Sequence, residues 1–234
     1  AFTRDDLLAH HRQLLGASNL VLAVFGDVKA AQVIAQVEKS MAALPAISLP
    51  AWPVLPPAPK QPARAEKRLP VKQTVLVRAW PGLATGDPRE DAVSILMDAL
   101  NGLSSDLFIE VRDKRGLAYY TGAAQFSGPV GGLFMIYAGT TEEGCAEVET
   151  QIQAQVDRLR SGGLRSEEFA RALAQLLAET ARARQNNAGL AQQCALDERL
   201  GLGYRHSLES AGRLENLAPE AVRAAAESLF AASG

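Results

Sequence analysis

A β-hairpin near the middle of the chain is the feature that most constrains its fold. Two strand-like runs, Tyr119 to Phe126 and Gly132 to Gly139, are separated by the five residues from Ser127 to Gly131. Glycine and proline in so short a connection are typical of a hairpin turn, which makes the two strands antiparallel neighbours. The fold must therefore contain an antiparallel sheet.

Further strands and many helices are predicted around this hairpin. The segment from Val71 to Trp80 alternates as a strand does, and the apolar run from Asn19 to Phe25 predicts a buried central strand. Helix starts are marked by capping residues or an early proline at Thr3, Asp87, Thr140, Ser166 and Pro219. This order of elements indicates an α+β fold, a mainly antiparallel sheet with helices packed on one face.

The segment from Pro45 to Pro62 is too rich in proline for the interior of a helix or a sheet. The part of the chain before it offers one predicted strand and two helices, which could hardly close a hydrophobic core alone. We therefore expect one domain over residues 1–234, with 45–62 as a long loop within it. Because the chain begins at Ala1 without a methionine and enters a helix almost at once, we expect a fragment of a longer protein.

Composition is that of a soluble globular protein, with 47% apolar residues, 21% charged residues and a formal net charge of −2. Such a balance disfavours nucleic acid and membrane partners, and no apolar run approaches the ~20 residues that span a bilayer. Arg158, Arg160 and Arg165 form a basic bias on two helices, but Glu167 and Glu168 are interspersed, which favours a solvated mixed-charge face. We expect a bacterial-type cytoplasm or periplasm, and the sequence leaves the compartment open.

The histidines and cysteines do not form a metal-binding motif in this sequence. Cys145 and Cys194 lack Cys-x-x-Cys spacing, His10 and His11 are adjacent, and His206 is alone. Neither H-x-x-x-H nor the inverted H-x-x-E-H occurs. We therefore expect no metal to be bound by this chain itself.

The stretch from Ser104 to Tyr119 holds the candidate catalytic residues. Ser104 can cap a short helix whose apolar face includes Phe108, and Arg112 lies one turn further on. Tyr119 follows Gly116 and opens the next strand, so Arg112 and Tyr119 could reach one point in space across a helix-to-strand junction. The alternative is structural, because an arginine in a last helical turn favours the helix dipole and a tyrosine at a strand start commonly packs.

Four segments of the chain, taken in order, resemble a known family. They are Asn19 to Val28, Leu103 to Phe108, Arg112 to Tyr119 and Ala138 to Thr140. The resemblance is to the second domain of a subunit in the pitrilysin/insulinase/mitochondrial processing peptidase family, and it spans nearly the whole chain. It implies two homologous halves around a chamber, one with the zinc motif H-x-x-E-H and the other with an arginine and a tyrosine seven residues apart.

By this resemblance Arg112 and Tyr119 are catalytic residues that lie opposite a zinc ion held by the partner half. A guanidinium and a phenol there would stabilise the oxyanion of peptide hydrolysis. Asn101, Gly102, Ser104 and Ser105 are implied to bind substrate, at the place where family members commonly have a glycine-rich run. Only Asn101-Gly102-Leu103 occupies that place, so neither a mobile glycine loop nor presequence recognition is expected.

The parent protein is thus expected to be a zinc metalloendopeptidase that acts on polypeptides. Its zinc-carrying half would come from the same chain, a homodimer or a heterodimer, and the isolated fragment is expected to be inactive. Two alternatives stay open, a scaffold subunit like the core proteins of respiratory complexes and a peptide-binding module that uses a sheet edge. The retention of Arg112 and Tyr119 favours the peptidase over the scaffold.

Overall fold

The computed structural model describes residues 2–49, 51–56 and 61–231. The chain divides into two compact units, Ala1–Pro53 with Ala181–Ser210, and Val54–Thr180 with Ala211–Gly234. The expected single domain over residues 1–234 stays a prediction. No helix in the described part of the chain is both long and apolar enough to cross a membrane.

The first unit is helical in its described part. Its elements are α1 (Arg4–Leu14), the short 3-10 turn η1 (Ala17–Asn19), α2 (Ala30–Met41), α7 (Asn187–Arg199) and a second 3-10 turn, η3 (Ser207–Glu209). The predicted capping box is confirmed, since the Thr3 hydroxyl accepts from the Asp6 amide while the Asp6 carboxylate accepts from the Thr3 amide. The predicted strand from Asn19 to Phe25 is wrong. Residues 20–25 are outside any ladder, because the described part of this unit offers no second strand to pair with.

Polar contacts join distant parts of the sequence within the first unit. The Arg199 guanidinium donates to the Asn19 side chain at 2.6 Å and lies over the Trp52 ring at 5.8 Å. The buried carboxylate of Asp197 accepts from both the amide and the hydroxyl of Ser207, at 2.8 and 3.0 Å. These bonds tie α7 to the N-terminal segment and to η3.

The second unit contains the antiparallel sheet. Its strands are β1 (Thr74–Gly82), β2 (Ala118–Gly128) and β3 (Gly131–Thr140), in the spatial order β1-β3-β2. The predicted hairpin is confirmed, because β2 and β3 pair antiparallel up to Gly128 and Gly131. The helical elements are α3 (Glu90–Leu100), α4 (Asp106–Phe108), the π-helical turn η2 (Ile109–Asp113), α5 (Cys145–Gly162), α6 (Ser166–Ala183), α8 (Ser210–Glu215) and α9 (Pro219–Leu229).

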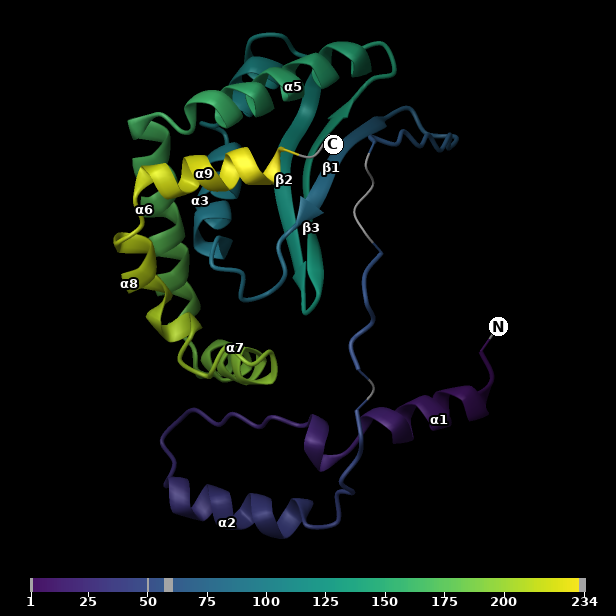
Figure 1. The fold of residues 1–234 in the computed structure, drawn as a ribbon, viewed down its shortest axis with the longest axis vertical. Helices are drawn as coiled ribbons and strands as arrows, with labels where there is room; N and C mark the ends of the chain where they lie inside the picture. The colour runs from purple at the N-terminus through teal and green to yellow at the C-terminus, as the bar shows by residue number, and fades with distance from the viewer. Residues whose placement is uncertain (1, 50, 57–60, 232–234) are drawn as a thin grey trace. The chain divides into compact units, whose positions relative to one another are not determined.

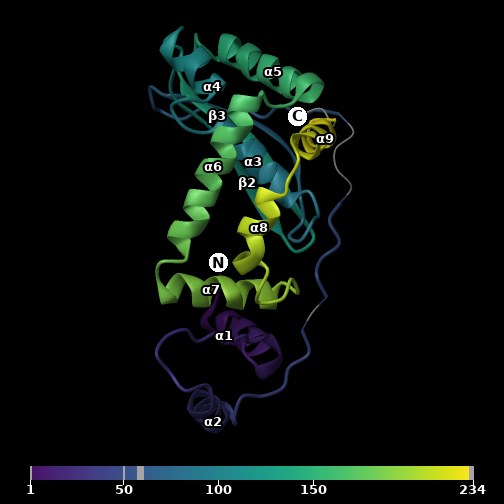
Figure 2. The same cartoon turned by 90° about the vertical axis from the view of Figure 1, so that its left-hand side faces the viewer.

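Helices cover one face of this sheet. Helices α3, α5 and α9 lie on the same side of the three strands in both views (Figure 1, Figure 2). On that side Trp80, Phe134 and Phe230 form the centre of the core, with ring centroids 5.0 Å apart for Trp80 and Phe230 and 5.7 Å apart for Phe134 and Phe230. The expected α+β fold with helices on one face of an antiparallel sheet is confirmed.

Two helices begin later than the capping signals predict. Helix α5 begins at Cys145, because the Thr140 hydroxyl donates to the carbonyl of Leu117 and so does not cap the helix. The Thr141 hydroxyl instead accepts from the Gly144 amide at 3.2 Å. Helix α3 likewise begins at Glu90, three residues after its predicted cap.

Asp98 is a buried carboxylate in α3. Its side-chain atom Oδ2 has no hydrogen-bond partner among the described residues. The pKa of Asp98 is raised to about 6, first by burial and second by the nearby carboxylate of Glu179, while Arg171 opposes the shift. The folded chain therefore binds more protons than the unfolded chain between about pH 4 and about pH 6.

We predict that Asp98→Asn stabilises the chain above pH 6. The wild-type free energy of unfolding should fall as pH rises from about 4 to about 6, because a buried carboxylate must ionise. The variant should lose this slope and gain about 1–2 kcal/mol at pH 7.5. Urea denaturation of both proteins across this range measures the effect. The control Asp157→Asn changes an exposed aspartate of α5 and should keep the wild-type slope; an identical response of the two variants would contradict the assignment.

Candidate functional site

Asn101 fastens the end of α3 to strand β2. Its side-chain amide donates to the carbonyl of Ala123 at 3.0 Å, and its side-chain oxygen accepts from the amide of Ala123 at 2.8 Å. These two bonds replace the backbone bonds that a neighbouring strand would make with Ala123 at this edge of the sheet. The segment after Asn101 is thereby held beside β2.

The predicted substrate-binding residues that follow differ in their surroundings. The predicted cap at Ser104 is wrong, because the buried Ser105 caps α4: its hydroxyl accepts from the Phe108 amide at 3.2 Å and donates to the carbonyl of Gly102 at 2.9 Å. Gly102 adopts a φ of +84°, which favours glycine. Gly102 and Ser104 are exposed, whereas Asn101 and Ser105 are used in holding the segment.

A network of four charged side chains anchors the start of α4. Asp106 in α4 accepts from Arg165 at 2.6 Å, and Arg158 in α5 lies 3.6 Å from the same carboxylate. Arg158 also donates to both carboxylate oxygens of Glu168 in α6, at 2.9 and 3.0 Å. The Arg165 guanidinium holds the pKa of Asp106 below its usual range. These contacts join the N-terminus of α4 to two other helices.

Arg160, Arg165 and Glu167 are exposed, as the predicted mixed-charge face requires, but Glu168 is buried and departs from that prediction. The Glu168 side chain is only 3% exposed, and its second partner is the Arg165 side chain at 3.1 Å. A buried carboxylate with two cationic partners has its charge compensated, which exposed pairs do not need. The alternation of charges along the sequence does not reveal which members lie under other helices.

Arg112 lies in the π-helical turn η2, which follows α4 directly. Its guanidinium stacks on the Phe108 ring, 4.8 Å from the centroid, as its position one turn after Phe108 suggests. The neighbouring cations are paired, Lys114 with Glu110 at 2.6 Å and Arg115 with Glu147 at 3.0 Å. Arg112 makes no ion pair within the part of the chain that the structure describes. Its direction is set by an aromatic ring, and its N–H groups stay available for a ligand.

Tyr119 lies at a β-bulge. Ala118 pairs with Thr140 and Tyr120 pairs with Gly139, so Tyr119 is the extra residue between consecutive pairs of the ladder. Bulges frequently redirect a side chain beside a functional site. The Tyr119 side chain is 67% exposed, which rules against the packing role that a tyrosine at a strand start commonly has.

Backbone bonds fix the path from Arg112 to Tyr119. The amide of Gly116 donates to the carbonyl of Arg112 at 2.9 Å, and the amide of Leu117 donates to the carbonyl of Val111 at 2.8 Å. Gly116 has a φ of +63°, so glycine is favoured at this turn. The Arg112 and Tyr119 side chains thus project from a fixed connection, and they do not hydrogen-bond to each other.

The bulge also changes which residues share a face with Tyr119. Strict alternation along β2 would place Thr121, Ala123 and Gln125 on the same face of the strand as Tyr119. These residues pair instead with Ala138, Ile136 and Phe134, which are buried under the helices. The extra residue shifts the alternation, so the face next to Tyr119 begins with Tyr120.

The helix-to-strand junction carries two kinds of hydrogen-bond donor. The guanidinium of Arg112 offers a planar set of N–H groups and the phenol of Tyr119 offers one neutral O–H group. Both side chains leave the fold from the same helix-to-strand junction, Tyr119 exposed and Arg112 over the Phe108 ring. Donors of these two kinds are the groups that stabilise a carbonyl oxygen on which negative charge develops.

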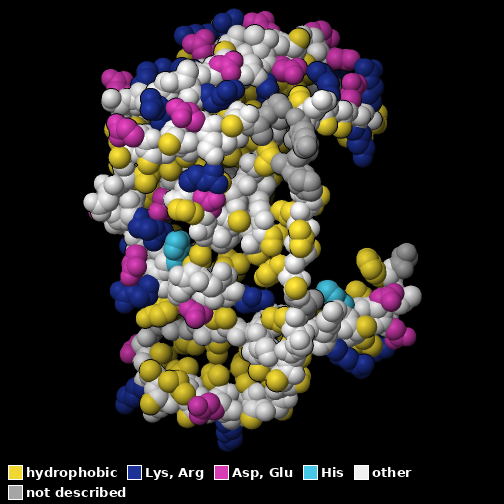
Figure 3. Space-filling model, in the orientation of Figure 1, with side chains coloured by type: hydrophobic (Ala, Val, Ile, Leu, Met, Phe, Trp, Pro, Cys, Tyr) yellow, Lys and Arg dark blue, Asp and Glu magenta, His cyan; other side chains and the backbone are white. Residues whose placement is uncertain are grey.

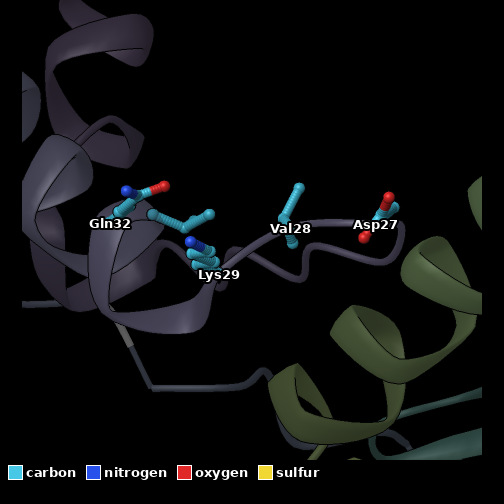
Figure 4. A pocket seen from close by; sticks show the side chains of 5 residues that line it. Asp27, Val28, Lys29 and Gln32 are labelled. Atoms are coloured by element: carbon cyan, nitrogen blue, oxygen red, sulfur yellow. The ribbon is translucent and has the colours of Figure 1, made fainter.

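The described residues contain no group of three or more His, Cys, Asp or Glu side chains that could hold a metal ion. A separate hollow of about 400 Å³ lies at the start of α2 in the first unit, lined by Asp27, Val28, Lys29, Gln32 and Val33. In Figure 4 the labelled side chains Asp27 and Val28 stand apart from Lys29 and Gln32 and do not point toward one centre. The hollow is open and its polar groups do not converge on a ligand.

Charged side chains are mixed on the surface seen in Figure 3. Basic and acidic groups alternate over the helical region around α5, without a continuous basic area on this face. The surface charge therefore does not point to a polyanionic ligand on this side.

We predict that Glu168→Gln destabilises the chain by about 2 kcal/mol, because it leaves two arginines around a neutral side chain. Chemical denaturation measures the change, and the exposed neighbour Glu167→Gln is the matched control with an expected change below about 0.5 kcal/mol. Equal unfolding free energies for the two variants would show that the buried Glu168 carboxylate does not stabilise the fold through its two arginines.

Comparison with known proteins gives concordant results. A family model described as "Peptidase M16 inactive domain" matches residues 1–176. An uncharacterized zinc protease of Streptomyces coelicolor is 31% identical over 240 residues, which covers 98% of this chain and 52% of that protein. The chain thus spans about half the length of this curated relative.

Solved structures share the fold. A peptidase M16 inactive domain from Pseudomonas fluorescens has a TM-score of 0.84 at 26% identity, over 97% of this chain and 54% of that one. A protease from Helicobacter pylori has a TM-score of 0.83 at 20% identity, over 98% of this chain and 57% of that one, and shows the fold alone. The family expected from the sequence is confirmed: the chain belongs to the peptidase M16 inactive-domain family.

Proposed function

We propose that this chain is the non-zinc-binding half of a zinc metalloendopeptidase and that Arg112 and Tyr119 assist hydrolysis in its substrate chamber. The observation that carries the proposal is the pair of donors at one junction, a guanidinium stacked on Phe108 and a phenol displaced by a bulge. The family membership and the zinc protease among the relatives support it.

In the proposed mechanism the two side chains act on the peptide group that is cleaved. The phenol of Tyr119 donates to the carbonyl oxygen as negative charge develops there, and the guanidinium of Arg112 donates to that oxygen or to the neighbouring substrate carbonyl. Removing one such donor typically lowers the rate ~10²–10³-fold. Arginine suits this role because it stays charged and presents its donors in a rigid plane.

The segment from Asn101 to Ser105 is proposed to line the substrate path. Gly102 and Ser104 are exposed and can touch a polypeptide, through a backbone without a side chain and through a small hydroxyl. Asn101 and Ser105 position this segment through the bonds to Ala123 and Phe108. Two of the four predicted residues would thus contact substrate, and the other two would position the segment.

Zinc itself belongs to the partner half in this proposal. The described residues do not fit a zinc ion, so no step of the reaction is assigned to a metal on this chain. Because the relatives are about twice as long as this chain, a zinc-carrying half can come from the same polypeptide. A homodimer or a heterodimer would place it opposite Arg112 and Tyr119 equally well.

A peptide-binding module without hydrolysis is the second candidate. It is favoured by the face of the sheet that the helices do not cover, which is apolar and exposed at Val75, Val77 and Phe126. Hydrolysis of an unstructured peptide by the full-length parent with zinc separates the two candidates. A scaffold subunit gives neither hydrolysis nor peptide binding.

We predict that Tyr119→Phe in the full-length parent lowers kcat at least tenfold while zinc content stays unchanged, because only the hydroxyl donor is lost. Turnover of an unstructured peptide measures the effect. Tyr204→Phe is the matched control, since Tyr204 is also exposed and lies in the first unit outside the proposed site. Wild-type kcat in the Tyr119 variant would remove Tyr119 from the mechanism.

Arg112→Lys should also lower kcat/KM at least tenfold, because lysine keeps the charge but loses the planar set of donors and the stacking on Phe108. Arg115→Lys, three residues away in an exposed ion pair with Glu147, should leave kcat/KM within about twofold. Steady-state kinetics of these two variants of the full-length parent measure the difference. Equal kcat/KM values for the two variants would mean that Arg112 contributes only charge.

A further inference from the structure

The face of the sheet that the helices do not cover carries no charged side chain at its strand positions. In the ladder register its side chains come from the odd positions 75–81 of β1, the even positions 120–126 of β2 and the odd positions 133–139 of β3. These positions read Val-Val-Ala-Pro, Tyr-Gly-Ala-Phe and Leu-Met-Tyr-Gly. We call this surface the open face. Val75, Val77 and Phe126 on it are 53%, 50% and 60% exposed.

Two tyrosine rings lie across glycines on the open face. A side chain at Gly139 would collide with the ring of Tyr120, and one at Gly122 would come within 2.7 Å of the Tyr137 hydroxyl oxygen. The two ring centroids are 6.2 Å apart at an angle of 57°. Rings held over backbone without side chains form a smooth apolar surface that also carries hydroxyls, which suits contact with many peptide sequences.

The open face is continuous with the proposed catalytic junction. Tyr120 is the first residue of β2 that points to this face, and it directly follows the bulged Tyr119. A polypeptide that lies along β2 and extends past Tyr120 would pass Tyr119. This continuity links an apolar surface to the donors proposed to act on a peptide carbonyl.

The dimensions of the open face fit an extended peptide. Nine residue pairs join β1 and β3, which at about 3.3 Å per residue makes the ladder about 26 Å long. Three strands about 4.8 Å apart give a width of about 14 Å, hence an area near 370 Å². A standard protein–protein interface needs about 800 Å² on each partner. The face is therefore too small to hold a folded partner by itself, whereas it matches an extended segment of about eight residues.

We propose that the open face binds an extended, uncharged and mainly apolar segment of the polypeptide substrate, beside the bond to be cleaved. The inference rests on the proposed function for the identity of the segment as substrate. It adds a specificity: acidic or basic residues in that segment lose their hydration on a face that offers no counter-charge. The parent should therefore prefer peptides whose charges lie outside this stretch of about eight residues.

The test is equilibrium binding to the full-length parent with zinc chelated, so that the probe stays intact. The probe is a fluorescein-labelled neutral peptide of eight residues made of Ala, Leu, Val and Ser, followed by anisotropy. Val77→Glu should weaken its binding about tenfold, and a matched peptide with two central lysines should recover most of that loss on the variant. Phe126→Ser, which adds no charge, should weaken the neutral peptide severalfold.

The matched control Ala224→Glu places the same charge on an exposed position of α9, in the helix layer, and should leave peptide affinity unchanged. Neutral-peptide affinity within twofold of wild type in both open-face variants overturns the proposal. A changed molecular mass of the parent in Val77→Glu also overturns it, because the face would then be covered by protein. Since binding is measured without turnover, an inactive Tyr119→Phe with an unaffected open face, or the reverse, separates this proposal from the catalytic one.

Discussion

One extra residue in strand β2 determines how the candidate site is presented. The antiparallel ladder fixes Ala118 opposite Thr140 and Tyr120 opposite Gly139, and Tyr119 is left between them without a partner in the ladder. Because side chains alternate strictly on a paired strand, the bulge sends Ala118 to the helix-covered core and Tyr120 to the open face. The exposure of Tyr119 and the continuity of the open face with it both depend on this bulge.

The other half of the site depends on charge compensation inside the fold. Asp106, Arg158, Arg165 and Glu168 join α4 to α5 and α6, so the turn that carries Arg112 starts from a fixed helix. Arg112 is then directed by Phe108, which belongs to the same short helix. The site thus combines surface side chains with a backbone held by buried bonds, as preorganised donors require.

Local signals in the sequence are sufficient to predict the turns and helix starts that depend on neighbouring residues alone. The hairpin, the capping box at Thr3 and the helix opened by Pro219 follow from turn residues, caps and a fixed φ, and the structure has them. The run from Asn19 to Phe25 shows the limit, since an apolar run becomes a strand only when another strand pairs with it. Arg112 and Tyr119 are identified by spacing and resemblance, and their catalytic role stays a prediction.

Features that arise between distant residues cannot be predicted in the same way. The bulge breaks the period of two on which strand patterns rest, so simple alternation assigns the neighbours of Tyr119 to the wrong face. Glu168 and Glu167 are adjacent acids in the sequence, yet only Glu168 is buried against two arginines. Which acid turns inward depends on how α5 and α6 pack, and this is a tertiary property.

The most direct test of the account is a double-mutant cycle on peptide hydrolysis by the full-length parent with zinc. The values of kcat/KM for Arg112→Lys, Tyr119→Phe and the double variant give the coupling between the two side chains. If both donate to the same reacting peptide group, the double variant should lose much less than the product of the two single losses. Losses that multiply, or single variants with wild-type kcat/KM, would contradict a shared catalytic role for the pair.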